Sequence, residues 1–141
     1  MEKTTSELTE ILKRSKSVND FFEQQAGELE FESIGSYLEF LLNIKGITKQ
    51  RAIQMANLDA SYAYQIFNGN RKNPGRNKII MLCFGMSLSL EETKKLMRLA
   101  KVSELYIRDS RDAVIMYSLE HHLTLIDTNE ELFSKGMEIL E

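Results

Sequence analysis

The sequence of 141 residues contains one cysteine, one proline and no tryptophan. A lone thiol excludes a disulfide within the chain and is typical of a reducing cytoplasm, where we expect this protein. That cysteine, Cys83, lies in the apolar run IIMLCFGM and is expected to pack in the core. No segment resembles a signal peptide, and none is apolar for long enough to span a bilayer. We therefore expect a soluble, intracellular protein.

Strand signals are also missing, because no run of β-branched residues alternates with polar ones. Apolar residues recur at helical spacing along almost the whole chain, which predicts an all-α fold. Residues 26–32, AGELEFE, look like a polar connection between helices. Capping chemistry predicts N-caps at Thr5 or Ser6, Ser17, Ser33, Thr48, Asp59 and Ser89, and helix ends at Gly46 and Gly69.

Catalytic motifs are absent from the sequence. No glycine-rich phosphate loop follows a strand, and no Ser/His/Asp or Cys/His set has a plausible scaffold, so we expect no enzyme. His121 and His122 are adjacent, so on a helix they point about 100° apart, and no second cluster supplies metal ligands. Arg108 and Asp112 have the i, i+4 spacing of a helix-stabilising ion pair. We expect neither a metal nor another cofactor.

The formal net charge of −3 is unevenly distributed along the chain. Residues 1–33 carry four Lys/Arg and eight Asp/Glu, residues 34–86 carry seven and two, and residues 87–141 carry seven and eleven. A basic segment between acidic flanks is typical of a chain that meets a polyanion. The alternative is that the acidic flanks neutralise the basic segment within the molecule.

The second half of the sequence repeats with an offset of 35 residues. RNKIIMLCFGMSLSLEETKKLMRLAK begins at Arg76, and RDAVIMYSLEHHLTLIDTNEELFSKG begins at Arg111. Each copy predicts a helix, a turn and a second helix, and we expect the two hairpins to stack. Chance similarity between two amphipathic hairpins is the alternative. The expected division is an N-terminal helical segment (1–32), a central module (33–86) and a C-terminal helical extension (87–141), whose hairpin from about 111 repeats 76–101.

The helix expected over residues 59–68 has one face without charge. Ala63, Ile66 and Phe67 should face the core. The opposite side consists of Ala60, Ser61, Tyr64, Gln65 and Asn68. Small side chains at a helix start allow close approach to another surface, and a glutamine amide both donates and accepts, as bidentate recognition of adenine requires. An ordinary solvated helix face is the alternative.

A cationic loop follows this helix, with Arg71, Lys72 and Arg76 placed to hold phosphate and Lys78 beyond them. The helix that begins near Lys49 also offers free backbone N–H groups to a phosphate. Solvation, or pairing with the acidic flanks, is the alternative for these cations. Charge alone does not separate the two interpretations.

The span 47–74 resembles the helix-turn-helix of the lambdoid phage repressor and Cro family, also called XRE-type regulators. That family's pattern is roughly Thr, eight residues, Gly, an aliphatic residue, a cap, and a recognition helix ending in Asn-Gly before a basic loop with proline. Here Thr48, Asn57, Leu58 and Asp59 are followed by SYAYQI, NG and RKNP. Asn57 replaces the family's glycine, and asparagine tolerates the left-handed backbone of the turn. The whole chain also resembles a group of small bacterial regulators with a helical C-terminal half, through YAYQIFNG and RDSRDAVIMYSLEHHLTL.

The resemblance implies a lambda repressor-like module whose recognition helix lies in the major groove of double-stranded DNA. By the resemblance, the base-contacting residues are Ala60, Ser61 and Gln65. From the resemblance, the loop cations and the two tyrosines, the phosphate-contacting candidates are Lys49, Gln50, Tyr62, Tyr64, Asn68, Arg71, Lys72 and Arg76. Packing against the preceding helix is an equal alternative for Tyr62.

The expected function is therefore a cytoplasmic transcription regulator without enzymatic activity. One module of this size contacts one half-site, so useful affinity implies a homodimer. Residues 87–141 are the candidate for self-association or for a protein partner, and no membrane contact is expected. The alternative is a protein-interaction adaptor that uses the helix-turn-helix as a scaffold without binding DNA.

Overall fold

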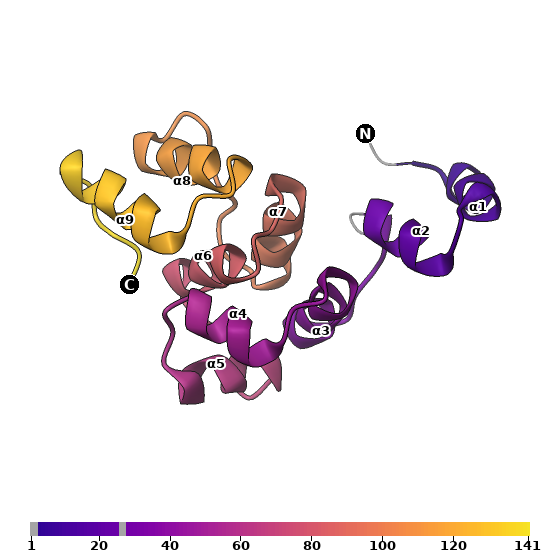
Figure 1. Cartoon of the computed structure of the whole chain (residues 1–141), viewed down its shortest axis with the longest axis horizontal. Coiled ribbons are helices and arrows are strands. Elements are labelled where there is room, and N and C mark those ends of the chain that lie inside the picture. Colours follow the sequence, from indigo (N-terminus) through magenta and orange to yellow (C-terminus); the bar gives the residue numbers. More distant parts are fainter. Residues whose placement is uncertain (1–2, 26–27) are drawn as a thin grey trace.

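The computed structural model of the protein describes residues 3–25 and 28–141, and over these residues it contains nine α-helices and no strand (Figure 1). The all-α prediction is confirmed. The helices are α1 (Thr5–Arg14), α2 (Val18–Gln24), α3 (Ile34–Lys45), α4 (Lys49–Met55), α5 (Ala60–Phe67), α6 (Arg76–Gly85), α7 (Leu90–Leu99), α8 (Ser110–Glu120) and α9 (Leu125–Ser134). Residues 26 and 27 of the predicted connection lie outside the described residues, and residues 28–33 contain no α-helix.

Most helices begin where capping chemistry predicts. The predicted side chains that accept a hydrogen bond from a first-turn backbone N–H are Ser17, Ser33, Thr48, Asp59 and Ser89. The prediction for the first helix was wrong by one residue, because Thr4 caps α1. The Thr4 hydroxyl accepts from the Glu7 N–H, and the Glu7 carboxylate accepts from the Thr4 N–H. This reciprocal pair fixes the helix start before Thr5.

Left-handed residues end two helices and turn the chain between two others. Asn57 connects α4 to α5 with a φ of 54°, so the predicted turn is confirmed. Gly46 ends α3 with a φ of 64°, and Gly69 follows α5 with a φ of 84°. At these angles a Cβ atom crowds the backbone, which favours glycine and is tolerated best by asparagine among the other residues. The turn at Asn57 therefore brings α5 directly after α4 without a long loop.

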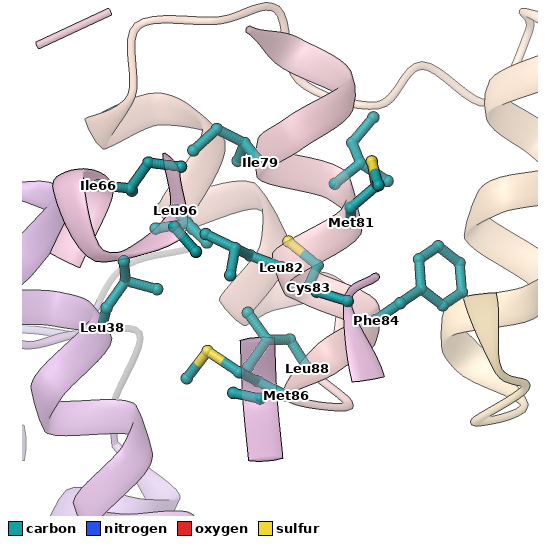
Figure 2. Close-up of a cluster of buried hydrophobic side chains, with 14 of the residues drawn as sticks. Leu38, Ile66, Ile79, Met81, Leu82, Cys83, Phe84, Met86, Leu88 and Leu96 are labelled. Carbon is teal, nitrogen blue, oxygen red and sulfur yellow. The ribbon is translucent and has the colours of Figure 1, made fainter. Parts of the chain in front are cut away.

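Helix α6 runs through the centre of the core. Every residue from 79 to 85 is buried, and α4, α7 and α9 all pack against this helix. Figure 2 shows that side chains of α3, α5, α6 and α7, such as Leu38 and Leu82, converge on one cluster. Cys83 is 0% exposed within it, as expected, and burial raises the pKa of its thiol to about 12. The thiol therefore stays protonated and fills space in the hydrophobic core.

Two glycines let helices approach each other closely. A Cβ atom at Gly85 of α6 would lie 2.3 Å from the Ala52 carbonyl oxygen and 2.8 Å from the Ala56 Cβ. A Cβ atom at Gly35 of α3 would lie 2.5 Å from the Phe67 carbonyl oxygen at the end of α5. Because both neighbours include backbone atoms, these positions set how near α4 lies to α6 and how near α5 lies to α3.

The hairpins α6–α7 and α8–α9 have matching turns 35 residues apart. Ser87 and His122 take φ values of 52° and 54° after the first helix of each hairpin. Lys101 and Gly136 take φ values of 59° and 70° after the second helix. Equivalent residues therefore carry the same backbone conformation in both copies.

An arginine at the start of each hairpin crosses to the chain beyond its second helix. Arg76 Nε donates to the Ser103 carbonyl at 2.8 Å, and Arg111 Nε donates to the Glu138 carbonyl at 2.7 Å. Each guanidinium also reaches the next carbonyl, 28 residues along the chain from itself. The hairpins pack on each other through α6 with α9 and α7 with α8. The repeat in sequence thus corresponds to a repeat in hydrogen bonding.

The helices form an elongated arrangement with α1 and α2 at one end and α8 and α9 at the other (Figure 1). Helix α5 lies along a third edge, below α4 in that view. Helix α1 packs against α2 and has no buried residue. Over the described residues, no helix is long and apolar enough to cross a membrane.

Candidate nucleic-acid interface

Helix α5 is held by one side and exposed on the other. Ala63, Ile66 and Phe67 are buried, and α5 packs against α3 and α4. The Asp59 carboxylate accepts from the Tyr62 N–H at 3.0 Å, which fixes the start of the helix. Because Gly35 lies under the last turn, the end of α5 is fixed as well. The helix therefore presents a defined surface rather than a loose one.

The exposed side of α5 agrees with the face expected from helical spacing. Ala60, Ser61, Tyr64 and Asn68 are exposed, and Gln65 is half-buried. None of these side chains is charged, and 45% of Tyr64 is accessible to solvent. This set is called the α5 edge below. A surface of small and amide side chains can approach another molecule closely and exchange hydrogen bonds with it.

Two cations lie on the Tyr62 ring beside the α5 edge. The Arg71 guanidinium is 4.6 Å from the ring centroid, and the Lys78 ammonium is 5.8 Å from it. The half-buried Tyr62 was expected either to contact phosphate or to pack, and the structure shows its ring beneath the cations. The Arg71 N–H also donates to the Gln65 carbonyl at 3.0 Å, which ties the loop to the end of α5. Positive charge is thereby held next to the helix.

The seven cations of residues 34–86 divide into two groups. Three of them have a carboxylate partner: Lys45 with Glu92 at 3.0 Å, Lys49 with Glu39 at 2.6 Å and Arg76 with Asp112 at 2.8 Å. Among the described residues, the other four have no carboxylate within ion-pair distance. These unpaired cations are Arg51, Arg71, Lys72 and Lys78. The acidic flanks therefore neutralise only part of the basic segment.

Arg76 is placed differently from the other loop cations. Its guanidinium makes two contacts with Asp112, at 2.8 and 3.1 Å, besides those with the Ser103 and Glu104 carbonyls. Through these contacts the Arg76 side chain links α6 to α8 and to the loop between α7 and α8. We therefore leave Arg76 out of the interface and assign it to the fold. Asp112 was expected to face Arg108, but Arg108 precedes the N-cap of α8, so the expected pairing within a helix is absent.

Lys49 and Gln50 lie in the first turn of α4. The Lys49 ammonium pairs with Glu39 and lies 5.1 Å from the Phe67 ring centroid, while Gln50 is exposed. A partly exposed pair of this kind contributes little to stability, so the Lys49 ammonium can exchange its partner for another anion. Arg51, in the same turn, is exposed and was missed by sequence reasoning. The signal that could have found it is its position beside Lys49 at the start of a capped helix.

Other kinds of site are not evident over the described residues. No group of three or more His, Cys, Asp or Glu side chains lies close enough together to hold a metal ion. A hollow of about 620 Å³ lies between α8 and α9, far along the chain from the α5 edge. Asp59 is a carboxylate beside the α5 edge, and its oxygen is used in capping the helix.

Comparisons of this chain with protein-family models, with curated proteins and with solved structures find no match. The similarity of residues 47–74 to the helix-turn-helix of the lambdoid repressors therefore stays a prediction from sequence.

Proposed function

We propose that this chain is a DNA-binding transcription regulator of the XRE type that reads the major groove with α5. The observation that supports the proposal is the uncharged α5 edge, flanked by cations that have no carboxylate partner. On this proposal residues 33–86 form a lambda repressor-like module, α4 and α5 form its helix-turn-helix, and α5 is the recognition helix. The remaining helices support the module and its assembly.

The side chains of the α5 edge suit contacts with base edges. An α-helix with its side chains is about 10–12 Å across, and the major groove is about 12 Å wide, so a helix such as α5 fits in it. Ala60 and Ser61 lie in the first turn, where small side chains permit close approach, and the Ala60 methyl can contact a thymine methyl. The Gln65 amide can pair with adenine in a bidentate way. Base recognition on this proposal comes from few hydrogen bonds, so specificity is modest.

The unpaired cations suit contacts with the sugar–phosphate backbone, since Arg71 and Lys78 lie at the Tyr62 ring of α5. Arg51 comes before α5 in the chain, and Arg71, Lys72 and Lys78 come after it. Phosphate contacts position a protein on the duplex without reading sequence, and they must flank the base contacts. Exposed tyrosine, asparagine and glutamine side chains, including Tyr64, Asn68 and Gln50, can add neutral hydrogen bonds to phosphate. A homodimer would place two such surfaces on two half-sites.

A protein-interaction adaptor is the second candidate, and one feature favours it. The Asp59 carboxylate is exposed at the start of α5, where it would approach a polyanion. On the adaptor hypothesis the α5 edge meets another protein, and the exposed Tyr64 ring supplies apolar contact area. The two functions differ in their dependence on salt.

Binding to duplex DNA at a series of salt concentrations tests the proposal. If four cations neutralise four phosphates, the logarithm of the binding constant falls against log[salt] with a slope of about −3 to −4. The measurement is fluorescence anisotropy with a pool of random duplexes at low salt, followed by selection of a preferred site. No binding at low salt, or a slope near zero, would contradict DNA binding and leave the adaptor.

Two substitutions separate base contacts from phosphate contacts. Gln65→Ala is expected to weaken binding to the preferred site by about 1–3 kcal/mol and to leave binding to random duplexes nearly unchanged. Lys72→Ala is expected to weaken both equally and to reduce the salt slope by about 1. Lys94→Ala, in α7, is the matched control for loss of one exposed lysine and should change neither quantity. Equal losses on both duplexes for Gln65→Ala would refute base reading by this residue.

A further inference from the structure

The hollow between α8 and α9 corresponds to a filled groove in the preceding hairpin. It has a volume of about 620 Å³ and is open, with Tyr117 62% exposed and Leu123 38% exposed along it. Six of its lining residues are Val114, Tyr117, Ser118, Leu123, Glu131 and Lys135. The residues 35 positions earlier are Ile79, Leu82, Cys83, Leu88, Leu96 and Ala100, and none of these is more than 4% exposed. The same surface is thus covered in one hairpin and open in the other.

Helix α3 packs against α7 and covers part of the groove of the first hairpin. The Lys45 ammonium, in the last turn of α3, pairs with the Glu92 carboxylate of α7 at 3.0 Å. Leu38 of α3 lies in the same cluster as Leu82 and Leu88 (Figure 2). Tyr37 is fully buried, close enough to Glu92 and Cys83 for both to help burial raise its pKa. An amphipathic helix with a cation at its end is therefore what this type of groove holds.

The second groove keeps the chemistry that α3 meets in the first. Asp127 stands 35 positions after Glu92, so a carboxylate is again available to a cation in the last turn of an occupying helix. Tyr117 and Leu123 supply apolar surface in the positions of Leu82 and Leu88. A helix like α3 would find an apolar floor and a carboxylate partner there.

Helix α1 has the same pattern as α3. Leu8, Ile11 and Leu12 of α1 have the i, i+3, i+4 spacing that Leu38, Leu41 and Leu42 have in α3, and both helices begin with a capping box. The last turn of α1 carries Lys13 and Arg14, as that of α3 carries Lys45. No residue of α1 is buried, and Leu12 is 44% exposed. Leu8 and Ile11 are half-buried, so the part of the apolar side around Leu12 is available for a further contact.

We propose that α1 of a second copy of this chain docks in the α8–α9 groove, in the place that α3 takes against α6–α7. A second copy is required because α1 and the α8–α9 hairpin of one chain lie at opposite ends of the molecule (Figure 1). The exchange is reciprocal, so each of the two copies gives α1 and receives α1, and the assembly closes as a two-fold dimer. The basic end of α1 meets Asp127, in the acidic third of the sequence. This inference does not rest on DNA binding.

A complementation experiment with the full chain tests the docking. Leu12→Glu places a charge on the docking side of α1, and Tyr117→Glu places one in the groove; both side chains are exposed, so the fold tolerates the changes. Each variant alone is expected to dimerise about 10-fold or more weakly than the original chain. An equimolar mixture recovers part of the dimer, because the intact α1 of the Tyr117→Glu chain docks in the intact groove of the Leu12→Glu chain and restores one of the two contacts. Sedimentation velocity measures the mass, and circular dichroism checks the helix content.

Two matched controls carry the same change outside the proposed contact. Ser6→Glu lies on the side of α1 away from its leucines, and Phe133→Glu removes a 78% exposed ring of α9 outside the groove. Both controls are expected to dimerise like the original chain. The proposal is overturned if the original chain stays monomeric at concentrations on the order of 100 μM. It is also overturned if Phe133→Glu disrupts the dimer while Tyr117→Glu does not, if Leu12→Glu has no effect, or if mixing recovers no dimer.

Discussion

The Arg76 guanidinium donates to the Ser103 and Glu104 carbonyls and pairs with Asp112, whose side chain is only 8% exposed. Asp112 Oδ2 also accepts from the Tyr106 N–H at 3.0 Å. A carboxylate that is this buried depends on its cation, because removing the cation leaves an unpaired charge out of water. Position in the sequence puts Arg76 beside the loop cations, yet its surroundings make it part of the fold.

Replacement of Arg76 therefore has a different consequence from replacement of its neighbour Lys72. Arg76→Ala is expected to lower the free energy of unfolding by about 3–5 kcal/mol and to leave the salt slope of DNA binding unchanged in the folded fraction. Lys72→Ala is expected to change the free energy of unfolding by no more than about 0.5 kcal/mol. The Lys72 side chain is exposed, and no carboxylate of the described residues pairs with it. Urea unfolding measures both. A stable Arg76→Ala protein with a reduced salt slope would return Arg76 to the interface.

Single helices were predicted well because their boundaries depend on local chemistry. Ser33 and Thr48 cap with side chains that reach only a few residues along the chain, so the sequence alone carries the signal. Stacking of the two hairpins was predicted from their repeat, but the particular side chains that pair between helices were not. The pairing of Arg76 with Asp112 joins residues 36 positions apart, and an i, i+4 rule assigned Asp112 to Arg108 instead. Sequence spacing identifies neighbours within a helix, whereas packing decides neighbours between helices.

The packing of α4 on α6 is the contact that positions the start of the proposed helix-turn-helix. Gly85→Ala would place a Cβ atom 2.3 Å from the Ala52 carbonyl oxygen, which cannot move without displacing α4. We expect a loss of about 2 kcal/mol or more in the free energy of unfolding, since overpacking outweighs the better helix propensity of alanine. DNA binding by the folded fraction should weaken as well, because Thr48 and Arg51 move with α4.

Gly75→Ala is the matched control at the start of the same helix. A Cβ atom there has no neighbour within 4 Å, so the expected loss is under about 1 kcal/mol and comes from the weaker N-cap. Thermal or urea unfolding of the two variants compares a packed glycine with an open one. Equal stability of both variants would show that α4 has room to shift away from α6.

Across the whole molecule, burial decreases from the centre of the chain toward its beginning. Residues 79–85 of α6 are all buried, whereas α1 has no buried residue. The helix that α1 packs against is α2. Helix α5, which carries the exposed α5 edge, is held by the buried centre, because it packs on α3 and α4. The recognition role proposed for α5 requires that its side chains be held rigidly. The sequence predicted the central module from its resemblance, but it did not predict that α1 would be left with an uncovered apolar side.

Amide hydrogen exchange of the full chain is expected to follow this difference in burial. Backbone amides of α6 should exchange only through global unfolding, and those of α1 should exchange through local opening at a much lower free energy. If α1 docks in the groove of a second copy, its protection rises with protein concentration while that of α6 does not, because the dimer covers Leu12, which is exposed in one chain. The Leu12→Glu chain should lose this concentration dependence and keep the protection of α6. If the protection of α1 is strong and independent of protein concentration, α1 is already covered within one chain. That result would contradict the docking of α1 in a second copy.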